Sequence, residues 1–333
     1  MKIEQVVRDK SVLFITTHRI DYIRNTQEIE LLRHNAKSVK LLYTNADNHC
    51  IGAAKIFLTL LFSSLKNYDV VLVSYMCQLV VPLFNWKFRK KVLIVDFFIS
   101  LYDALVFDRQ KFRDRSLAAK FCHMLDNASV KNADLIIADT KAHATYFKNE
   151  FKIADDCMEV LYLQADSSIY YPKKIKKLDV WKEQFLVVYF GTVIPLQGFE
   201  IVLEAVERLK HEKGIHFLII GPVTKLYEKS VTDNATYIDW VPQEKLAEYI
   251  AMSDLCLAGH FNNKIMKAQR TIPGKAYIYE SMGKPMILGD STANHELFAE
   301  DEYHQFVTLG DGNALAEKIL EMRHSITERR IKI

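Results

Sequence analysis

The sequence has few cysteines, and none of them lies close enough to another to suggest a shared site. Its 333 residues contain five cysteines, all widely spaced and without a Cys-x-x-Cys pair. An odd number of scattered cysteines argues against a disulfide framework and against a zinc site of the usual ligand spacing. The pattern is typical of a protein from a reducing cytoplasm.

Long hydrophobic runs and an excess of one charge are also missing. The longest apolar stretches, 56–65 and 70–84, are shorter than the roughly 20 residues that a membrane-spanning helix needs. The first 16 residues carry charges on both sides of a short apolar run, which predicts no secretory signal. The formal net charge is +3, so bulk charge gives no reason to expect a nucleic-acid partner.

Glycine is nearly absent from the first half of the chain. Only Gly52 precedes residue 190, whereas the other ten glycines lie between Gly191 and Gly312. The length is about twice that of an average domain, so two domains are expected. The glycine distribution indicates that these domains handle their ligands differently, with close backbone approach confined to the second.

Short runs rich in Val, Ile and Leu recur along both halves, separated by stretches long enough for helices. Such runs are typical of buried parallel strands. Strands are predicted at 12–16, 38–43, 70–74, 92–95, 134–138 and 158–163, then at 186–190, 216–220, 235–238, 254–258, 285–289 and 304–308. Helical patterns in the second half cover 199–211, 243–252, 275–282 and 311–323.

These elements predict an α/β chain of two Rossmann-like, doubly wound domains that face each other across a cleft. The predicted divisions are an N-terminal domain at 1–170, a linker at 171–184, a second domain at 185–320, and a C-terminal helix or tail at 321–333. Open α/β sheets bind ligands at the carboxyl ends of their strands, so the strand-to-helix loops should carry the function.

Two loops of the second half combine glycines with features that favour an anion. In loop 189–200 a strand runs into Gly191, and a helix that follows presents free N–H groups to an anion. In loop 267–285, Arg270 and Lys275 bracket Gly274 at the start of a helix. Cations at the positive end of a helix dipole are unfavourable, so a bound anion would compensate them. A tight turn and a solvated basic loop are the structural alternatives.

A third loop, 289–297, places hydroxyl groups ahead of a short helix. Ser291 and Thr292 could bind phosphate there, and Glu296 could accept hydrogen bonds from sugar hydroxyls. A helix cap with an acidic residue in its first turn explains the same pattern.

The motifs of the second half, taken together, resemble the nucleotide-binding domain of the family-4 glycosyltransferases, which have the two-domain GT-B fold. The resemblance runs from about 187 to 319 through YFGTVIPLQG, LIIG, YIDWVPQEKLAEYIAMSDLCLAG, RTIPGKAY, MGKPMILGDS and GDGNALAEKIL. The first half is similar to part of that family through VDFFISLYDALVFDR, ADLIIADT and LYLQADSSIYYP. The resemblance therefore covers essentially the whole chain.

The resemblance implies a retaining transferase that moves a sugar from a nucleoside diphosphate to an acceptor without a metal or another cofactor. The sequence contains no Asp-x-Asp motif for a divalent ion. A UDP-sugar is the favoured co-substrate, and the acceptor would be a glycan, a lipid-linked glycan or a protein in cell-surface polysaccharide or glycoconjugate synthesis. The implied donor-binding residues are Gly191, Thr192, Gln197, Trp240, Val241, Gly259, Gly274, Ser291, Thr292 and Glu296.

The chain departs from the family where the diphosphate is usually held. Thr192 and Gln197 stand where the family commonly has cations, so Arg270 and Lys275 are predicted to replace them as catalytic groups. They would stabilise the negative charge that develops on the leaving diphosphate. A family glutamate position is occupied by Ile278, and Glu280 lies two residues later, so a ribose-binding role is not transferred to Glu280.

The N-terminal domain is predicted to hold the acceptor through side chains. Loop 17–25, THRIDYIRN, has no glycine, and His18 is its predicted acceptor contact. Asp96 ends the strand VLIVD where many relatives carry a histidine, which predicts a catalytic role in orienting the acceptor. Asp103 is a second acceptor-binding candidate. The alternative for Asp96 is a structural cap of the next helix.

The N-terminal half is the more basic one, with a net charge of +4 over residues 1–170 against −1 for the remainder. Segments 84–91 and 107–120 mix aromatic and basic residues, as expected for peripheral contact with anionic lipid at the inner face of the cell membrane. Solvated helix faces explain these segments as well.

Two other functions fit parts of the pattern. A catalytically weak or inactive GT-B module could bind a nucleotide or a partner transferase, because the usual cation and glutamate positions are altered. A nucleotide-sugar epimerase is a further alternative, although no cluster of acidic and histidine residues for proton abstraction is evident.

Overall fold

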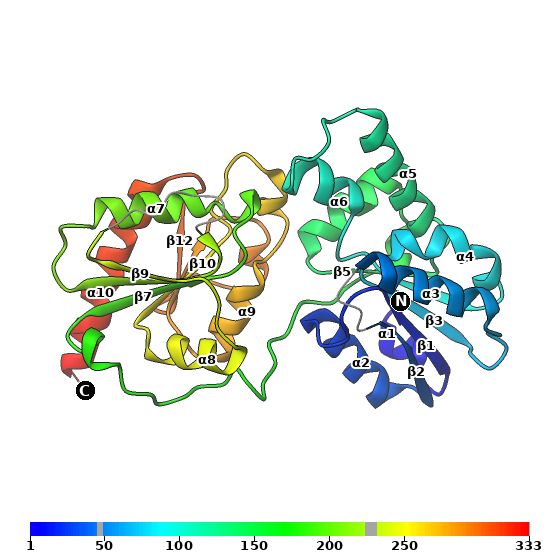
Figure 1. The fold of residues 1–333 in the computed structure, drawn as a ribbon, viewed down its shortest axis with the longest axis horizontal. Helices are drawn as coiled ribbons and strands as arrows, with labels where there is room; N and C mark the ends of the chain where they lie inside the picture. Colours follow the sequence, from blue (N-terminus) through cyan, green and yellow to red (C-terminus); the bar gives the residue numbers. More distant parts are fainter. Residues whose placement is uncertain (45–48, 224–231, 333) are drawn as a thin grey trace. The chain divides into compact units, whose positions relative to one another are not determined.

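The computed structural model describes residues 1–44, 49–223 and 232–332, and the chain divides into two compact units. The first unit is Met1–Gln164 and the second is Ala165–Ile333. Figure 1 shows that each unit has a sheet covered by helices on both faces.

The N-terminal unit contains a six-stranded parallel sheet in the order β2-β1-β3-β4-β5-β6. Its strands are β1 (Ser11–Thr16), β2 (Ser38–Leu42), β3 (Val70–Ser74), β4 (Val92–Asp96), β5 (Leu135–Ala138) and β6 (Met158–Val160). The strand order reverses between β1 and β3. That reversal point is where doubly wound sheets bind ligands.

Helices cover the two faces of this sheet in unequal numbers. One face packs against α1 (Ile3–Val7) and α2 (Ile23–Asn35). The other face packs against α3 (His49–Phe62), α4 (Val81–Phe88), α5 (Leu117–Val130) and α6 (Lys141–Phe151). Central strands such as β3 are buried at every position, so their apolar runs are continuous rather than alternating.

The C-terminal unit contains a second six-stranded parallel sheet, in the order β12-β11-β10-β7-β8-β9. Its strands are β7 (Phe185–Phe190), β8 (Ile215–Ile220), β9 (Ala235–Ile238), β10 (Leu255–Gly259), β11 (Met286–Gly289) and β12 (His304–Val307). The order reverses between β7 and β10, which places the expected ligand edge beside the ends of these two strands.

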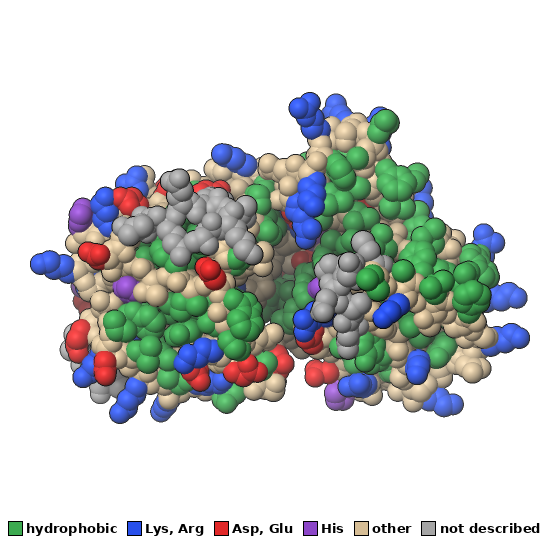
Figure 2. Space-filling model, viewed as in Figure 1, with side chains coloured by type: hydrophobic (Ala, Val, Ile, Leu, Met, Phe, Trp, Pro, Cys, Tyr) green, Lys and Arg blue, Asp and Glu red, His purple; other side chains and the backbone are tan. Residues whose placement is uncertain are grey.

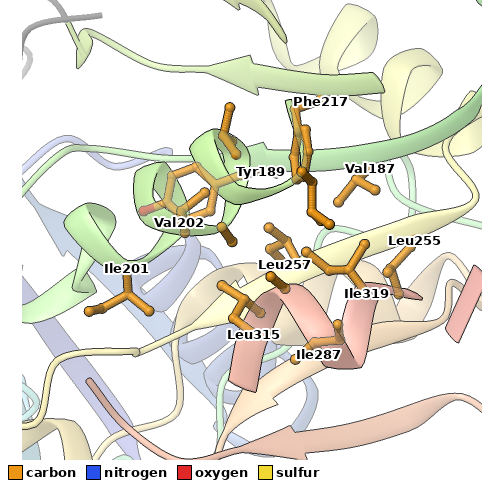
Figure 3. Packing of buried hydrophobic residues seen from close by; sticks show 14 of the residues in the cluster. Val187, Tyr189, Ile201, Val202, Phe217, Leu255, Leu257, Ile287, Leu315 and Ile319 are labelled. Carbon is orange, nitrogen blue, oxygen red and sulfur yellow. The ribbon is translucent and has the colours of Figure 1, made fainter. Parts of the chain in front are cut away.

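The helices of the C-terminal unit are α7 (Phe199–Arg208), α8 (Gln243–Met252), α9 (Gly274–Ser281) and α10 (Gly312–Lys332). The apolar faces of α7 and α10 pack together over the central strands, as the cluster in Figure 3 shows for Val202, Leu315 and Ile319 with Val187 and Leu257. This core fixes the β7-to-α7 connection that begins the candidate site.

All twelve predicted strands form, each within one to three residues of its predicted bounds, and both sheets are parallel. The fold class read from the sequence is confirmed. Within the described ranges, no helix combines the length and hydropathy needed to cross a bilayer. Four cysteines, at 77, 122, 157 and 256, are free thiols.

The segment that was predicted as a linker, 171–184, packs on the C-terminal unit over part of its length. The Trp181 ring is buried at 6.1 Å from Tyr249 and 5.9 Å from His216. Lys177 forms an ion pair with Asp254 and donates to the carbonyl of Gln184 over 2.7 Å. The contacts with His216, Tyr249 and Asp254 tie the segment to β8, to α8 and to the residue that precedes β10.

Candidate functional site

The predicted donor-binding residues follow the carboxyl ends of the strands of the C-terminal sheet. Gly191 and Thr192 follow β7, and Gly259 is the last residue of β10. Ser291 and Thr292 follow β11. Because these strands are parallel, their carboxyl ends meet at one edge, so the structure brings loops distant in sequence to the reversal point of the sheet.

Gly191 is required by the close approach of other chain segments. Its φ is +138°, and a Cβ built there would lie 3.3 Å from Cε of Lys275. A Cβ on the neighbouring Gly221 would stand 2.3 Å from the Gly191 carbonyl oxygen. The two glycines therefore let the β7 and β8 loops approach each other and leave room for the lysine.

Lys275 is the best-defined cation of the site. It is the second residue of α9, and its side chain is buried, with only 5% of the residue exposed. Its Nζ donates to Oε1 of Gln197 over 2.6 Å and lies 4.2 Å from the ring centroid of Tyr189. The structure thus brings Lys275, predicted as a catalytic group, into hydrogen-bond contact with Gln197, predicted as a donor-binding residue.

The environment of Lys275 disfavours its charge. No ion pair among the described residues includes it, although the amide oxygen of Gln197 and the face of Tyr189 partly compensate the ammonium. Burial lowers the pKa of Lys275 to about 7. A bound anion would restore the charged form, so this pocket has the electrostatics of an anion site.

His260 is a neighbour that the sequence prediction missed. It follows Gly259 at the end of β10 and is buried, with 5% of its surface exposed. Burial, together with the charges of Lys275 and Lys267, lowers the pKa of His260 to about 3, so the ring stays neutral. Its position directly after a strand-end glycine was the available signal.

The loop carrying Arg270 lies against the loop that follows β11. The backbone N–H of Ala293 donates to the carbonyl of Gln269 over 3.1 Å, and that of Thr292 donates to the Gln269 side-chain oxygen over 3.3 Å. Arg270 is half-buried and ends the short 3-10 helix Met266–Gln269. The two loops that the sequence assigned to the donor are therefore neighbours.

The remaining donor-binding candidates differ in their local roles. Ser291 is buried and its hydroxyl accepts from the N–H of Asn294 over 3.2 Å, which caps the turn that contains Glu296. Trp240, which follows β9 and precedes Val241, is 76% exposed. Whether these residues contact the donor stays a prediction.

Gly198 and Gly274 differ in how much space surrounds their Cα atoms, so alanine substitutions at the two positions should differ in their effect on stability. Gly198 has φ +64°, and a Cβ there would stand 2.4 Å from the backbone nitrogen of Asn262, whereas no described atom lies within 4 Å of a Cβ on Gly274. We expect Gly198→Ala to lower the free energy of unfolding by about 1–3 kcal/mol. Gly274→Ala should leave it within about 1 kcal/mol. Urea denaturation checks both, and equal stabilities would contradict the packing.

Glu280 points to a different partner. Its Oε2 lies 2.7 Å from Nε2 of His304 in β12, and Asp301 also contacts that histidine at 3.1 Å. The contact with His304 gives the Glu280 carboxylate a partner within the C-terminal unit. The sequence pattern had assigned it no ribose-binding role.

In the N-terminal unit, His18 belongs to an aromatic cluster at the carboxyl edge of the sheet. Its ring stacks on Tyr75 with centroids 4.2 Å apart and lies 5.1 Å from Tyr22. Tyr75 and Met76, directly after β3, both have positive φ angles, of 36° and 58°. The cluster sits where the strand order reverses, and such uncommon backbone angles often occur at functional edges.

Asp96 is committed to a buried ion pair. Only 1% of the surface of Asp96 is exposed. Both of its carboxylate oxygens accept hydrogen bonds from the Arg24 guanidinium, each over 3.1 Å. Arg24 also donates to the carbonyl of Leu161 over 2.5 Å. Glu28 Oε1 also lies 3.8 Å from Nε of Arg24, and burial together with the nearby Asp96 charge raises the pKa of Glu28 well above its usual value. The immediate role of Asp96 is to hold Arg24, and its catalytic role stays a prediction.

Asp103 lies in a second buried polar group. Its Oδ1 accepts from the hydroxyl of Tyr146 over 3.0 Å, and its Oδ2 lies 3.7 Å from Nε2 of His143. The other ring nitrogen of His143 lies 2.6 Å from Asp139. A contact of Asp103 with the acceptor also stays a prediction.

Comparison with known proteins identifies the class. Residues 184–325 match the family described as Glycosyl transferases group 1. An uncharacterized 41.2 kDa protein in the cps region of Klebsiella pneumoniae is 20% identical over 287 residues, which cover 84% of this chain and 76% of that protein.

Two solved structures have the same fold. Sucrose-phosphate synthase from Thermosynechococcus elongatus has a TM-score of 0.70 at 15% identity, covering 96% of this chain and 90% of that chain. HepE from Anabaena, in complex with UDP, has a TM-score of 0.64 at 14% identity, covering 94% and 90%. The protein is a glycosyltransferase with the GT-B fold, and residues 184–325 match the group 1 glycosyl transferases, as the motifs predicted.

Proposed function

We propose that the protein transfers a sugar from a UDP-sugar to a glycan, lipid-linked glycan or protein acceptor, with retention of configuration and without a metal. The observation that carries the proposal is Lys275, a buried lysine at the N-terminus of α9 with no ion pair among the described residues. Such a group is stabilised by a bound diphosphate. HepE, which has the same fold, binds UDP.

The chemical role of this pocket is to receive the charge of the leaving group. Breaking the bond between the sugar and the diphosphate develops negative charge on the bridging oxygen, and a preorganised cation lowers that barrier. Lys275, Arg270 and the N–H groups that begin α9 would supply positive charge there, so the proposal needs no divalent ion. Retention would follow if the acceptor attacks from the face that the diphosphate leaves.

The acceptor side of the proposal rests on the N-terminal unit. His18 and its aromatic neighbours Tyr22 and Tyr75 offer ring faces on which a sugar could stack. The curated relative in a cps region supports an acceptor in cell-surface polysaccharide synthesis. A cytoplasmic protein that contacts the membrane from the inside would meet such an acceptor.

Nucleotide binding provides the first test. At a concentration one hundred times Kd, UDP should stabilise the folded protein by about 2.7 kcal/mol, which corresponds to a rise in melting midpoint of about 5–10 °C. A thermal-shift panel of UDP, GDP and other nucleoside diphosphates measures this directly. Donor hydrolysis with UDP-sugars then separates an enzyme from a binding module. Binding of UDP without release of any sugar would contradict the proposed transfer.

The pKa of Lys275 makes UDP affinity depend on pH. Diphosphate binds the protonated lysine, while the free protein loses this proton above about pH 7. A terminal phosphate completes its ionisation near pH 6, so UDP keeps its charge above pH 7. We expect the affinity to fall by about tenfold per pH unit between pH 7 and 9. Calorimetric titration should show this slope and its loss in Lys275→Met; affinity that rises with pH would refute the assignment.

A further inference from the structure

The apolar run 56–65, too short to span a membrane, forms an exposed helix face in the N-terminal unit. Leu58, Leu61 and Phe62 of α3 are all exposed, and Phe62 is the most exposed of them at 82%. Leu83 and Trp86 of α4, three residues apart on one side of that helix, are exposed by 57% and 60%. We call these five residues the α3–α4 face.

The two helices of this face are joined rigidly. The rings of Phe57 and Phe84 pack with centroids 5.1 Å apart beneath it. Lys87 of α4 donates to the carbonyls of Leu61 over 2.7 Å and of Ser63 over 3.0 Å, and so satisfies the C-terminus of α3. The exposed side chains therefore sit on one fixed surface, and in Figure 2 hydrophobic side chains gather over α3 and α4.

The charge around this face has one sign. Between residues 49 and 95 the sequence has six lysines and arginines but a single acid, Asp69, which accepts a backbone N–H from Ser11 over 2.9 Å. Lys55, Lys66, Arg89 and Lys90 are exposed. A second copy of this face would bring like charges together, whereas an anionic bilayer complements them.

We propose that the α3–α4 face docks on an anionic lipid bilayer, with Leu58, Leu61 and Phe62 entering the acyl boundary and Trp86 at the headgroup level. Interfacial helices bind in this way through apolar side chains flanked by cations, and indole rings favour the boundary region. The sequence indicated basic segments at 84–91 and 107–120; the structure adds α3, which carries the apolar contact. The inference does not depend on the chemistry of sugar transfer.

Vesicle sedimentation tests the proposal on the full chain. The wild type should pellet with phosphatidylglycerol/phosphatidylcholine vesicles and not with phosphatidylcholine alone. The double variant Leu58→Asp with Phe62→Asp should lose about tenfold or more in partitioning, because it replaces inserted apolar groups with anions. The matched control is Leu178→Asp with Val180→Asp, which adds two charges at exposed apolar positions of the C-terminal unit and should bind like the wild type.

Fluorescence gives a second, local readout. Of the three tryptophans, Trp181 is buried, so Trp240→Phe leaves Trp86 as the exposed reporter. Its emission should shift to the blue with anionic vesicles and not with neutral ones. A wild type that stays in the supernatant, an aspartate variant that still pellets, or a concentration-dependent dimer that the variant abolishes would each overturn the proposal. UDP binding should remain equal to wild type in the two aspartate double variants, which separates this result from any failure of the proposed transferase activity.

Discussion

Lys275→Ala is expected to lower the rates of sugar transfer and of UDP-sugar hydrolysis by about a hundredfold or more. Removal of one preorganised group that stabilises developing negative charge typically has an effect of this size. The side chain is buried, and its Nζ donates to Gln197 over 2.6 Å. Steady-state rates with a UDP-sugar, with and without acceptor, measure the loss.

The controls separate a role in chemistry from a role in folding. A buried lysine whose pKa is lowered destabilises the folded state below its unfolded pKa, so Lys275→Met should leave the ligand-free protein at least as stable near pH 7. Lys264→Ala, at an exposed lysine of the loop after β10, should retain near-normal rates. Lys275→Arg keeps the charge but not the compact shape, and should recover only part of the rate.

Arg270→Ala provides an independent arm of the same test. The loop that carries Arg270 is fixed to the loop after β11 through Gln269, so the variant should fold normally. We expect a loss of rate comparable to that of Lys275→Ala. Near-normal rates in either variant would contradict the assignment of that residue to the leaving group.

The strands and the family could be predicted from the sequence because their signals are local. Continuous runs of Val, Ile and Leu mark the central strands, and the glycines that follow β7 and end β10 mark the ligand edge. The pairing of Lys275 with Gln197 could not be predicted, because these residues are 78 positions apart and meet only when two loops fold onto one edge. His260 was missed because a lone histidine after a strand has no spacing signal.

Asp96 and the run 56–65 show a second limit of local signals. The end of a strand indicated a ligand-facing carboxylate, but its partner Arg24 lies 72 residues away and removes that carboxylate from solvent. The length of the run 56–65 served only to exclude a membrane-spanning helix. Which of its apolar side chains are exposed depends on which side of α3 packs against the sheet. Burial is a property of the tertiary fold, and sequence periodicity alone does not assign it.

Asp96→Ala should lower the free energy of unfolding of the N-terminal unit by about 3–5 kcal/mol. The change leaves the guanidinium of Arg24 buried without its bidentate partner, and breaking a buried pair by removing one member has this typical effect. The change also removes the Asp96 charge, one of the causes that raise the pKa of Glu28, so Glu28, whose Oε1 lies 3.8 Å from Nε of Arg24, offsets part of the lost pairing. Urea denaturation, followed by Trp86 fluorescence, reports on this unit.

Replacing both members of the pair distinguishes a structural role for Asp96 from a catalytic one. Asp96→Leu combined with Arg24→Met removes both buried charges and should recover most of the lost stability, since apolar groups of similar volume often replace buried pairs at little net change. UDP binding and UDP-sugar hydrolysis depend on the C-terminal unit and should then be close to wild type. If Asp96→Ala instead stays within about 1 kcal/mol of wild-type stability while transfer to the acceptor is lost, the carboxylate acts on the acceptor directly, because a residue needed only for packing cannot abolish transfer without destabilising the fold.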